Sequence, residues 1–145
     1  MKLTKTQREK ISDIGKKYRL GLIILHGSYA TGKIRPNSDL DIGILGKKPI
    51  GNKKFDNIFA ELEKIFGNNK GRELDVKSLH RIDPLFRYQV ARDSQLIFGD
   101  QTTYNEFRAY AFQSYYDSAS LFKLEELLIK KYQGFLNRKY QKRYA

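Results

Sequence analysis

Two short stretches of this chain have the hydrophobic pattern of strands that would lie side by side in a sheet. The run Leu22–Leu25 is wholly aliphatic, which is typical of a buried strand. In Asp39–Ile44, the residues Leu40, Ile42 and Ile44 alternate with two aspartates and a glycine. Because successive side chains of a strand point to opposite faces, this alternation predicts that Asp39 and Asp41 project from one face.

Helical periodicity and turn signals predict the remaining elements of the first hundred residues. Thr4–Gln7 matches a capping box that opens a first helix, and the apolar spacing within Ile58–Phe66 indicates a second. Glu73–Leu79 alternates like a strand. Asp83-Pro84 would open a short helix, because proline suits the first helical position. Gln95–Phe98 resembles a short last strand.

From Thr102 onward the pattern is helical almost to the end of the chain. One apolar register runs over Tyr104–Tyr115 and another over Leu121–Phe135, and Asp117-Ser118 is expected to mark a break between two helices. The second register is apolar enough either to pack on the sheet or to meet a partner.

The predicted fold class is therefore α/β (α+β), with a mixed sheet flanked by helices and a helical C-terminal extension. We expect one domain over residues 1–145, with an α/β core over 1–100 and helices with a basic tail over 101–145.

Composition limits the classes of protein to which the chain can belong. The 145 residues contain no cysteine, which excludes disulfides and thiolate metal sites and fits a reducing cytoplasm. No stretch resembles a signal peptide or a membrane span, so we expect no membrane partner. The net charge is +12, and residues 130–145 hold six basic residues and no acid. Such charge favours an acidic protein or a nucleic acid as partner, although a solvated helix face and a loose tail would look the same.

The candidate chemistry lies at the end of the first strand and at the start of the second. Gly27-Ser28 follow the aliphatic strand, and ten residues later comes Asp39-Leu-Asp41. A tight glycine turn lets backbone N–H groups approach a triphosphate, and Mg²⁺ prefers carboxylate oxygens. The pattern predicts a nucleotide and metal site, against the alternative of an ordinary turn and two solvated acids.

A two-metal reaction needs a third carboxylate. Asp75 is the favoured candidate, because its short side chain places its oxygens rigidly on one face of the predicted strand Glu73–Leu79. Glu73 lies on the same face and is the alternative, and an exposed acid without a metal role is also possible.

The segment Gly27–Asp41 resembles the core of the DNA polymerase β-like nucleotidyltransferase superfamily. The chain as a whole is similar to the MNT (minimal nucleotidyltransferase) antitoxins that are paired with HEPN-domain toxins. That wider resemblance also includes the Asp75 strand, the run Phe86–Phe98 and the later Tyr115–Asp117.

The resemblance implies a site, an activity and a partner. Asp39, Asp41 and Asp75 would hold two Mg²⁺ ions, while Gly27 and Ser28 would bind the phosphates of ATP. AMP would be transferred from ATP to a tyrosine of the cognate HEPN toxin, which would silence the toxin.

One position departs from the family pattern. Thr31 stands where an arginine is often found, so Lys33 or Arg35 is expected to supply the positive charge for the phosphates. A nucleic acid partner is possible but not required.

Two other functions remain open from the sequence. The chain could be a binding antitoxin that covers its toxin without catalysis, or a nucleotidyltransferase of small molecules such as aminoglycosides. His26, beside the Gly-Ser turn, is expected to be a hydrogen-bonded structural residue rather than a base.

Overall fold

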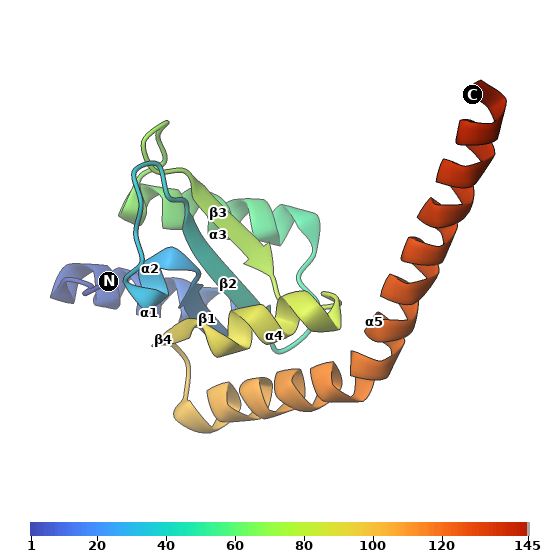
Figure 1. The fold of residues 1–145 in the computed structure, drawn as a ribbon. Coiled ribbons are helices and arrows are strands. Elements are labelled where there is room, and N and C mark those ends of the chain that lie inside the picture. The colour runs from blue at the N-terminus through green and yellow to red at the C-terminus, as the bar shows by residue number, and fades with distance from the viewer. Residues whose placement is uncertain (145) are drawn as a thin grey trace.

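Four strands form one mixed sheet in the order β3-β2-β1-β4 in the computed structural model, which describes residues 1–144 (Figure 1). Strand β1 is antiparallel to both β2 and β4, whereas β2 and β3 run parallel. The elements in chain order are α1 (Lys5–Lys17), β1 (Leu20–His26), α2 (Ser28–Thr31), β2 (Leu40–Gly46), α3 (Asn52–Phe66), β3 (Leu74–Ser78), α4 (Pro84–Arg92), β4 (Ser94–Phe98) and α5 (Gln101–Tyr144).

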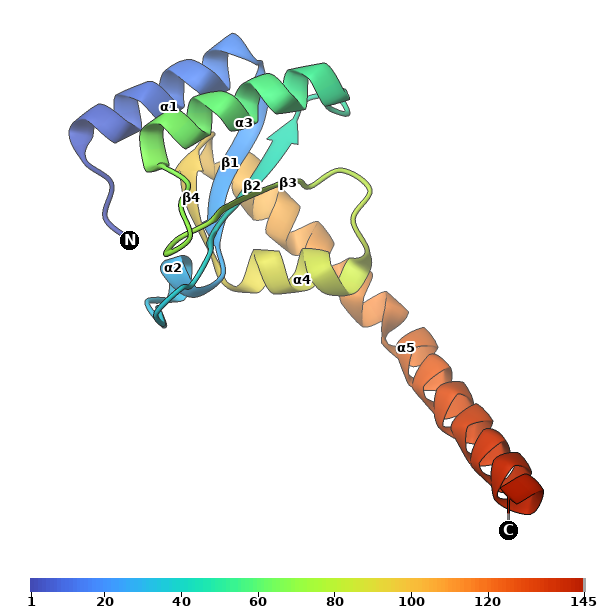
Figure 2. The ribbon, with the colours of Figure 1, turned by 90° about the horizontal axis from the view of Figure 1, so that it is seen from above.

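Helices cover both faces of the sheet, α1 and α3 on one side and α4 with the start of α5 on the other (Figure 2). On the first side, Ile23, Leu25 and Ile42 pack with buried residues of α1 and α3. On the second, Leu22 and Ile24 pack with buried residues of α4 and α5. The alternation of the strands thus divides the core into two layers and leaves the polar positions of β2 on the α4 side.

Local signals in the sequence account for where the elements start. Thr4 and Gln7 form the predicted capping box at α1. At α4, the Asp83 carboxylate accepts a hydrogen bond of 2.9 Å from the Phe86 N–H, and Pro84 stands in the first turn. Strand β2 begins at Leu40, one residue later than the alternation indicates. The mixed sheet with flanking helices confirms the predicted fold class.

Helix α5 corrects the expectation of two separate helices with a break at Asp117-Ser118, because one helix continues from Gln101 to Tyr144, although it bends sharply between its first and second halves (Figure 1). Neither residue is a proline or glycine, and polar side chains that face solvent do not end a helix by themselves. The Leu121–Phe135 register does not pack on the sheet either, since its large apolar side chains are exposed. Ala145, at the end of the predicted tail, lies outside the described residues.

None of the helices within residues 1–144 is both long enough and apolar enough to cross a bilayer.

Candidate active site

The registers of three adjacent strands bring His26, Asp41 and Asp75 into one row across the sheet. His26 of β1 pairs with Asp41 of β2, and Asp41 pairs with Asp75 of β3. Because paired residues point to the same face, all three side chains lie on the side covered by α4. The structure therefore brings together Asp41 and Asp75, whose relation the sequence pattern could not establish.

Gly27 brings the backbone unusually close to the Asp41 carboxylate. It caps the short helix α2 with a φ of 69°, in the left-handed region that favours glycine. A Cβ atom at this position would collide with Oδ2 of Asp41. The turn after β1 thus needs glycine for its conformation and also for the approach to the acid.

The acidic groups of the site repel one another. Burial, followed by the negative charges of Asp75 and then Asp39, raises the pKa of Asp41 to about 6. Asp39 itself is exposed, just before β2 begins. The three aspartates predicted from the sequence are therefore electrostatic neighbours.

Of the two candidate third acids, Asp75 and not Glu73 acts on Asp41. Glu73 is exposed, and its backbone carbonyl accepts a hydrogen bond from the Leu40 N–H at 2.8 Å. The Asp75 carboxylate forms an ion pair with Lys77, with 2.9 Å between Oδ2 and Nζ. Alternation along the strand places Lys77 on the face of Asp75, and its charge partly neutralises the aspartates.

The donor set suits a hard divalent cation. Carboxylate oxygens are the preferred ligands of Mg²⁺, and a cation would relieve the repulsion that raises the pKa of Asp41. Within residues 1–144, however, no three His, Cys, Asp or Glu side chains are already gathered at ligand spacing.

A cleft of about 300 Å³ opens beside Asp41, between the sheet and α4. Its walls carry positive charge as well as acid, since Lys77 and Arg92 line it together with Asp93 and the ring of Phe86. Sequence reasoning missed the part of this wall that comes from α4, because only the packing of α4 on the sheet turns Phe86 and Arg92 toward the aspartates.

His26 lies at the base of this cleft, and its environment differs from the prediction. Its side chain is 7% exposed and meets the Phe86 ring edge-on, with 6.0 Å between the ring centroids. Nε2 has no hydrogen-bond partner, so the expectation of a hydrogen-bonded residue is wrong. Burial lowers the pKa of His26 to about 4, which keeps the imidazole neutral.

The residues predicted for the phosphates lie around the turn that follows β1. Ser28 is half-buried in the first position of α2. The Thr31 hydroxyl donates to the Gly27 and Ser28 carbonyls at 3.3 Å, so it stabilises its own turn. Lys33 is exposed but close enough to Asp93 to help lower that group's pKa, after the hydrogen bond from Arg92. No contact in the described chain links the exposed Arg35 to the aspartates.

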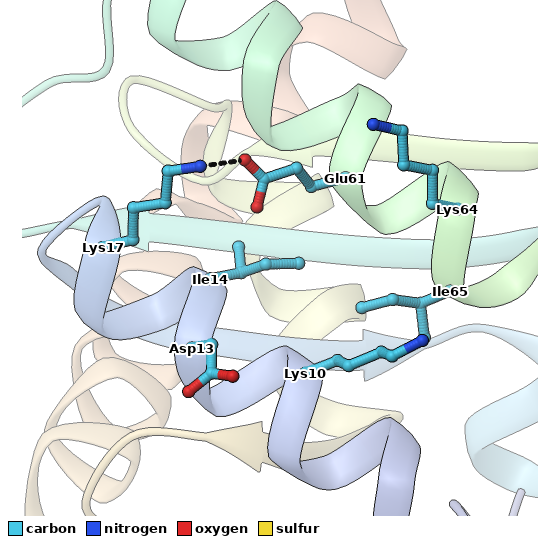
Figure 3. Close-up of a pocket in the computed structure, with 7 residues that line it drawn as sticks. All are labelled: Lys10, Asp13, Ile14, Lys17, Glu61, Lys64 and Ile65. Atoms are coloured by element: carbon cyan, nitrogen blue, oxygen red, sulfur yellow. Dashed lines mark hydrogen bonds and ion pairs between the residues drawn. The ribbon is translucent and has the colours of Figure 1, made fainter.

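A larger hollow, of about 470 Å³, lies between α1 and α3 on the other face of the sheet (Figure 3). An ion pair between Lys17 and Glu61, with 2.5 Å between Nζ and Oε1, closes one end of it. Lys10, Asp13 and Lys64 also border it. The hollow contains none of the site residues, and its lining is that of two solvated helix faces.

The family model described as "Polymerase beta, Nucleotidyltransferase" matches residues 9–103, which include the whole acidic row. The chain belongs to this nucleotidyltransferase family. A comparison with curated protein sequences found no match.

Solved structures with the same fold include antitoxins and an antibiotic-modifying enzyme. A chain of a toxin–antitoxin crystal structure with AMP-PNP is 22% identical, with a TM-score of 0.67, and the match covers 84% of this chain and 98% of that one. A chain of the tri-AMPylated Shewanella oneidensis HEPN toxin in complex with MNT antitoxin is 18% identical, with a TM-score of 0.65 and coverage of 88% and 99%. The spectinomycin adenyltransferase AAD(9) from Enterococcus faecalis, with ATP and spectinomycin, is 16% identical, with a TM-score of 0.53 and coverage of 81% and 66%. At these identities, the likeness concerns the fold.

Proposed function

We propose that this chain is an Mg²⁺-dependent antitoxin that transfers AMP from ATP to a tyrosine hydroxyl of a HEPN-domain toxin. The proposal rests chiefly on the neighbouring acids Asp41 and Asp75 on adjacent strands. Asp41 lies against Gly27 and lines a cleft between the sheet and α4. The family match and the toxin–antitoxin structures of the same fold support the class of reaction and the class of partner.

In this reaction the acceptor oxygen attacks the α-phosphorus of ATP. A new P–O bond forms, the bond to the bridging oxygen breaks, pyrophosphate leaves, and the acceptor hydroxyl loses its proton. Two Mg²⁺ ions held by Asp39, Asp41 and Asp75 would lower the pKa of that hydroxyl and neutralise charge on the pyrophosphate.

The other site residues orient the nucleotide and exclude water. Gly27 and Ser28 offer a tight turn to the β- and γ-phosphates, and Lys33 adds charge from the adjoining loop. Arg35 could add charge only if its loop moved toward the aspartates. The Phe86 ring covers the base of the cleft and restricts water beside Asp41.

Charge favours a protein acceptor over an aminoglycoside. The chain carries a net charge of +12, which repels polycationic antibiotics and attracts an acidic protein surface. A tyrosine hydroxyl needs no charge of its own to enter the cleft, so the partner's surface can supply the attraction.

The decisive test is the intact mass of a candidate HEPN-domain toxin after incubation with this chain, ATP and Mg²⁺. We expect mass to be added in whole AMP steps, and peptide mapping to place them on tyrosine. The double variant Asp39→Asn/Asp41→Asn should add none.

A matched pair of variants tests the third carboxylate. Asp75→Asn should abolish transfer, whereas Glu73→Gln, two residues away on the same strand edge, should leave it within about twofold of the wild type. Full activity of Asp75→Asn would remove this residue from the site.

Thr31 supports one alternative function. Its hydroxyl is engaged in its own turn at a position where the family often carries arginine, which weakens the phosphate site. If the HEPN protein stays unmodified but forms a stable complex, the chain is instead a binding antitoxin, and the AMP-transfer proposal fails.

A further inference from the structure

The second half of α5 extends away from the core as a single helix with nothing packed against it among the described residues (Figures 1 and 2). Only Tyr104, Phe107 and Ala111 of this helix are buried, all in its first half. An isolated helix is marginally stable in water, and most helices in proteins depend on the packing of an apolar face. The free half therefore needs an occupant for its apolar side.

The apolar side of this half is symmetric about Leu128. Residues at distances of four, seven and eleven positions from it, in both directions, lie on the same side of the helix. Read along the chain, this stripe consists of Asp117, Leu121, Leu124, Leu128, Tyr132, Phe135 and Lys139. Its five apolar members are all more than half exposed. The stripe thus has an apolar centre, an acid at one end and a base at the other.

We infer that this stripe is the docking surface for a second copy of the chain, in an antiparallel helix pair centred on Leu128. In that arrangement, two residues equally far from Leu128 in opposite directions lie at the same level. Leu121 of one copy then lies beside Phe135 of the other, and Leu124 beside Tyr132. Asp117 meets Lys139 at each end, so the apolar centre is closed by two pairs of opposite charge.

The charges outside the stripe agree with the same register. Glu125 and Glu126, the other two acids of residues 117–144, fall level with Lys131 and Lys130 of the partner copy. The remaining basic residues fall level with serine or glutamine, so none faces another base. A parallel pair would instead place like charges together along the whole basic end, which is unfavourable.

The register places the cores of the two copies at opposite ends of the helix pair. The stripe from Asp117 to Lys139 spans about 33 Å at the rise of an α-helix. The residues of α5 that pack on the core end at Tyr115, which stacks on Tyr88 of α4 and falls level with Gln141, near the C-terminal end of the partner's helix. Each core is thus at one end of the pair, with its cleft open.

The inference does not depend on the proposed AMP transfer, and it can be tested on the purified chain alone. Sedimentation equilibrium across a dilution series should show a dimer of twice 17.0 kDa. Leu128→Glu should raise the dissociation constant of the dimer at least about 100-fold. Leu127→Glu is the matched control, because Leu127 is 63% exposed and adjacent but lies off the stripe, and it should stay within about twofold of the wild type.

Two further measurements test the orientation. Lys139→Asp should weaken the dimer about tenfold, and adding Asp117→Lys should restore it. The chain has no cysteine, so a single Leu128→Cys should form a covalent dimer on oxidation, while Leu127→Cys should not. A chain that is monomeric at every concentration overturns the inference. The inference is also overturned if the chain is monomeric and binds the HEPN protein or anionic lipid vesicles through this stripe, so that Leu128→Glu abolishes that binding.

Discussion

Gly27 and Asp41 lie so close together that a side chain at position 27 would displace the Asp41 carboxylate. The contact joins the turn after β1 to the central acid of β2, which are fourteen residues apart in the chain. In the proposed reaction, this contact would bring the phosphate-binding turn and a metal ligand to the same phosphate, because the backbone and the carboxylate lie against one another.

Gly27→Ala should therefore damage the site more than the fold. An alanine held at the Gly27 dihedral angles, φ 69° and ψ −151°, costs about 1–3 kcal/mol because essentially only glycine adopts them, and its Cβ would also displace the Asp41 carboxylate. We expect AMP transfer to fall about 100-fold, as a misplaced catalytic group does. Gly32→Ala is the control, because Gly32 has a φ of 77° but open space around its Cβ position. Equal losses of activity in the two variants would contradict the role of the contact.

Asp41→Asn should make the metal-free protein more stable at neutral pH. The pKa of Asp41 is raised to about 6 in the fold, so the native state binds this proton more tightly than the unfolded chain does. Loss of the proton between about pH 4 and pH 6 therefore destabilises the fold, and the amide avoids that loss. Allowing for partial exposure, we expect a gain of about 1 kcal/mol, or about 3 °C in Tm.

Thermal unfolding of both proteins in EDTA at about pH 7.5 and about pH 4 measures this effect. The gain should be present at the higher pH and absent at the lower one. A stabilisation that is the same at both values would mean that the negative charge of Asp41 is not its cause.

The features predictable from the sequence are those that neighbouring residues determine. Asp39 and Asp41 could be assigned to one site because alternation within a strand is local, and the capping box at Thr4 placed the start of α1 correctly. The pairing of His26 with Asp41 depends on an antiparallel register between residues far apart in the chain. No local pattern contains that register, which is why the isolated imidazole was expected to have a hydrogen-bond partner.

The cleft and helix α5 show the same limit. Lys77 faces the acids because β3 pairs with β2, and Arg92 because α4 packs over the sheet. At Asp117-Ser118 the polar residues indicated a break, but a helix that faces solvent accepts them without one. In each case the deciding interaction is a tertiary contact or its absence.

His26→Leu should stabilise the protein at acid pH, whereas the gain from Asp41→Asn appears at neutral pH. Burial lowers the pKa of His26 to about 4, so the unfolded chain binds this proton more readily, and stability is lost as the pH falls from about 6.5 to about 4. Leucine cannot take up the proton. We expect the variant to be near wild type at about pH 7.5 but more stable by about 2 kcal/mol at about pH 4.5.

Urea unfolding at the two pH values measures that difference directly, with each variant compared with the wild type at the same pH. Asp41 titrates in an overlapping pH range, and its contribution to the free energy of unfolding is present in both proteins. Comparing variant and wild type at the same pH therefore cancels it. If His26→Leu were equally destabilising at both values, its packing against Phe86 and not its protonation would dominate.

Gly134→Ala should strengthen the free half of α5 without touching the core or the stripe centred on Leu128. A Cβ atom at Gly134 meets nothing within 4 Å, and alanine is favoured over glycine inside a helix by about 1 kcal/mol. Because this half has no buried residues, its local opening is governed by helix propensity and by whatever covers the apolar side.

Amide hydrogen exchange over residues 121–144 should slow about fivefold, with α1 and α3 unchanged. Gly51→Ala, also with open space but outside α5, should leave that exchange as it is. Unchanged protection in Gly134→Ala would mean that this half of the helix opens only together with the rest of the protein.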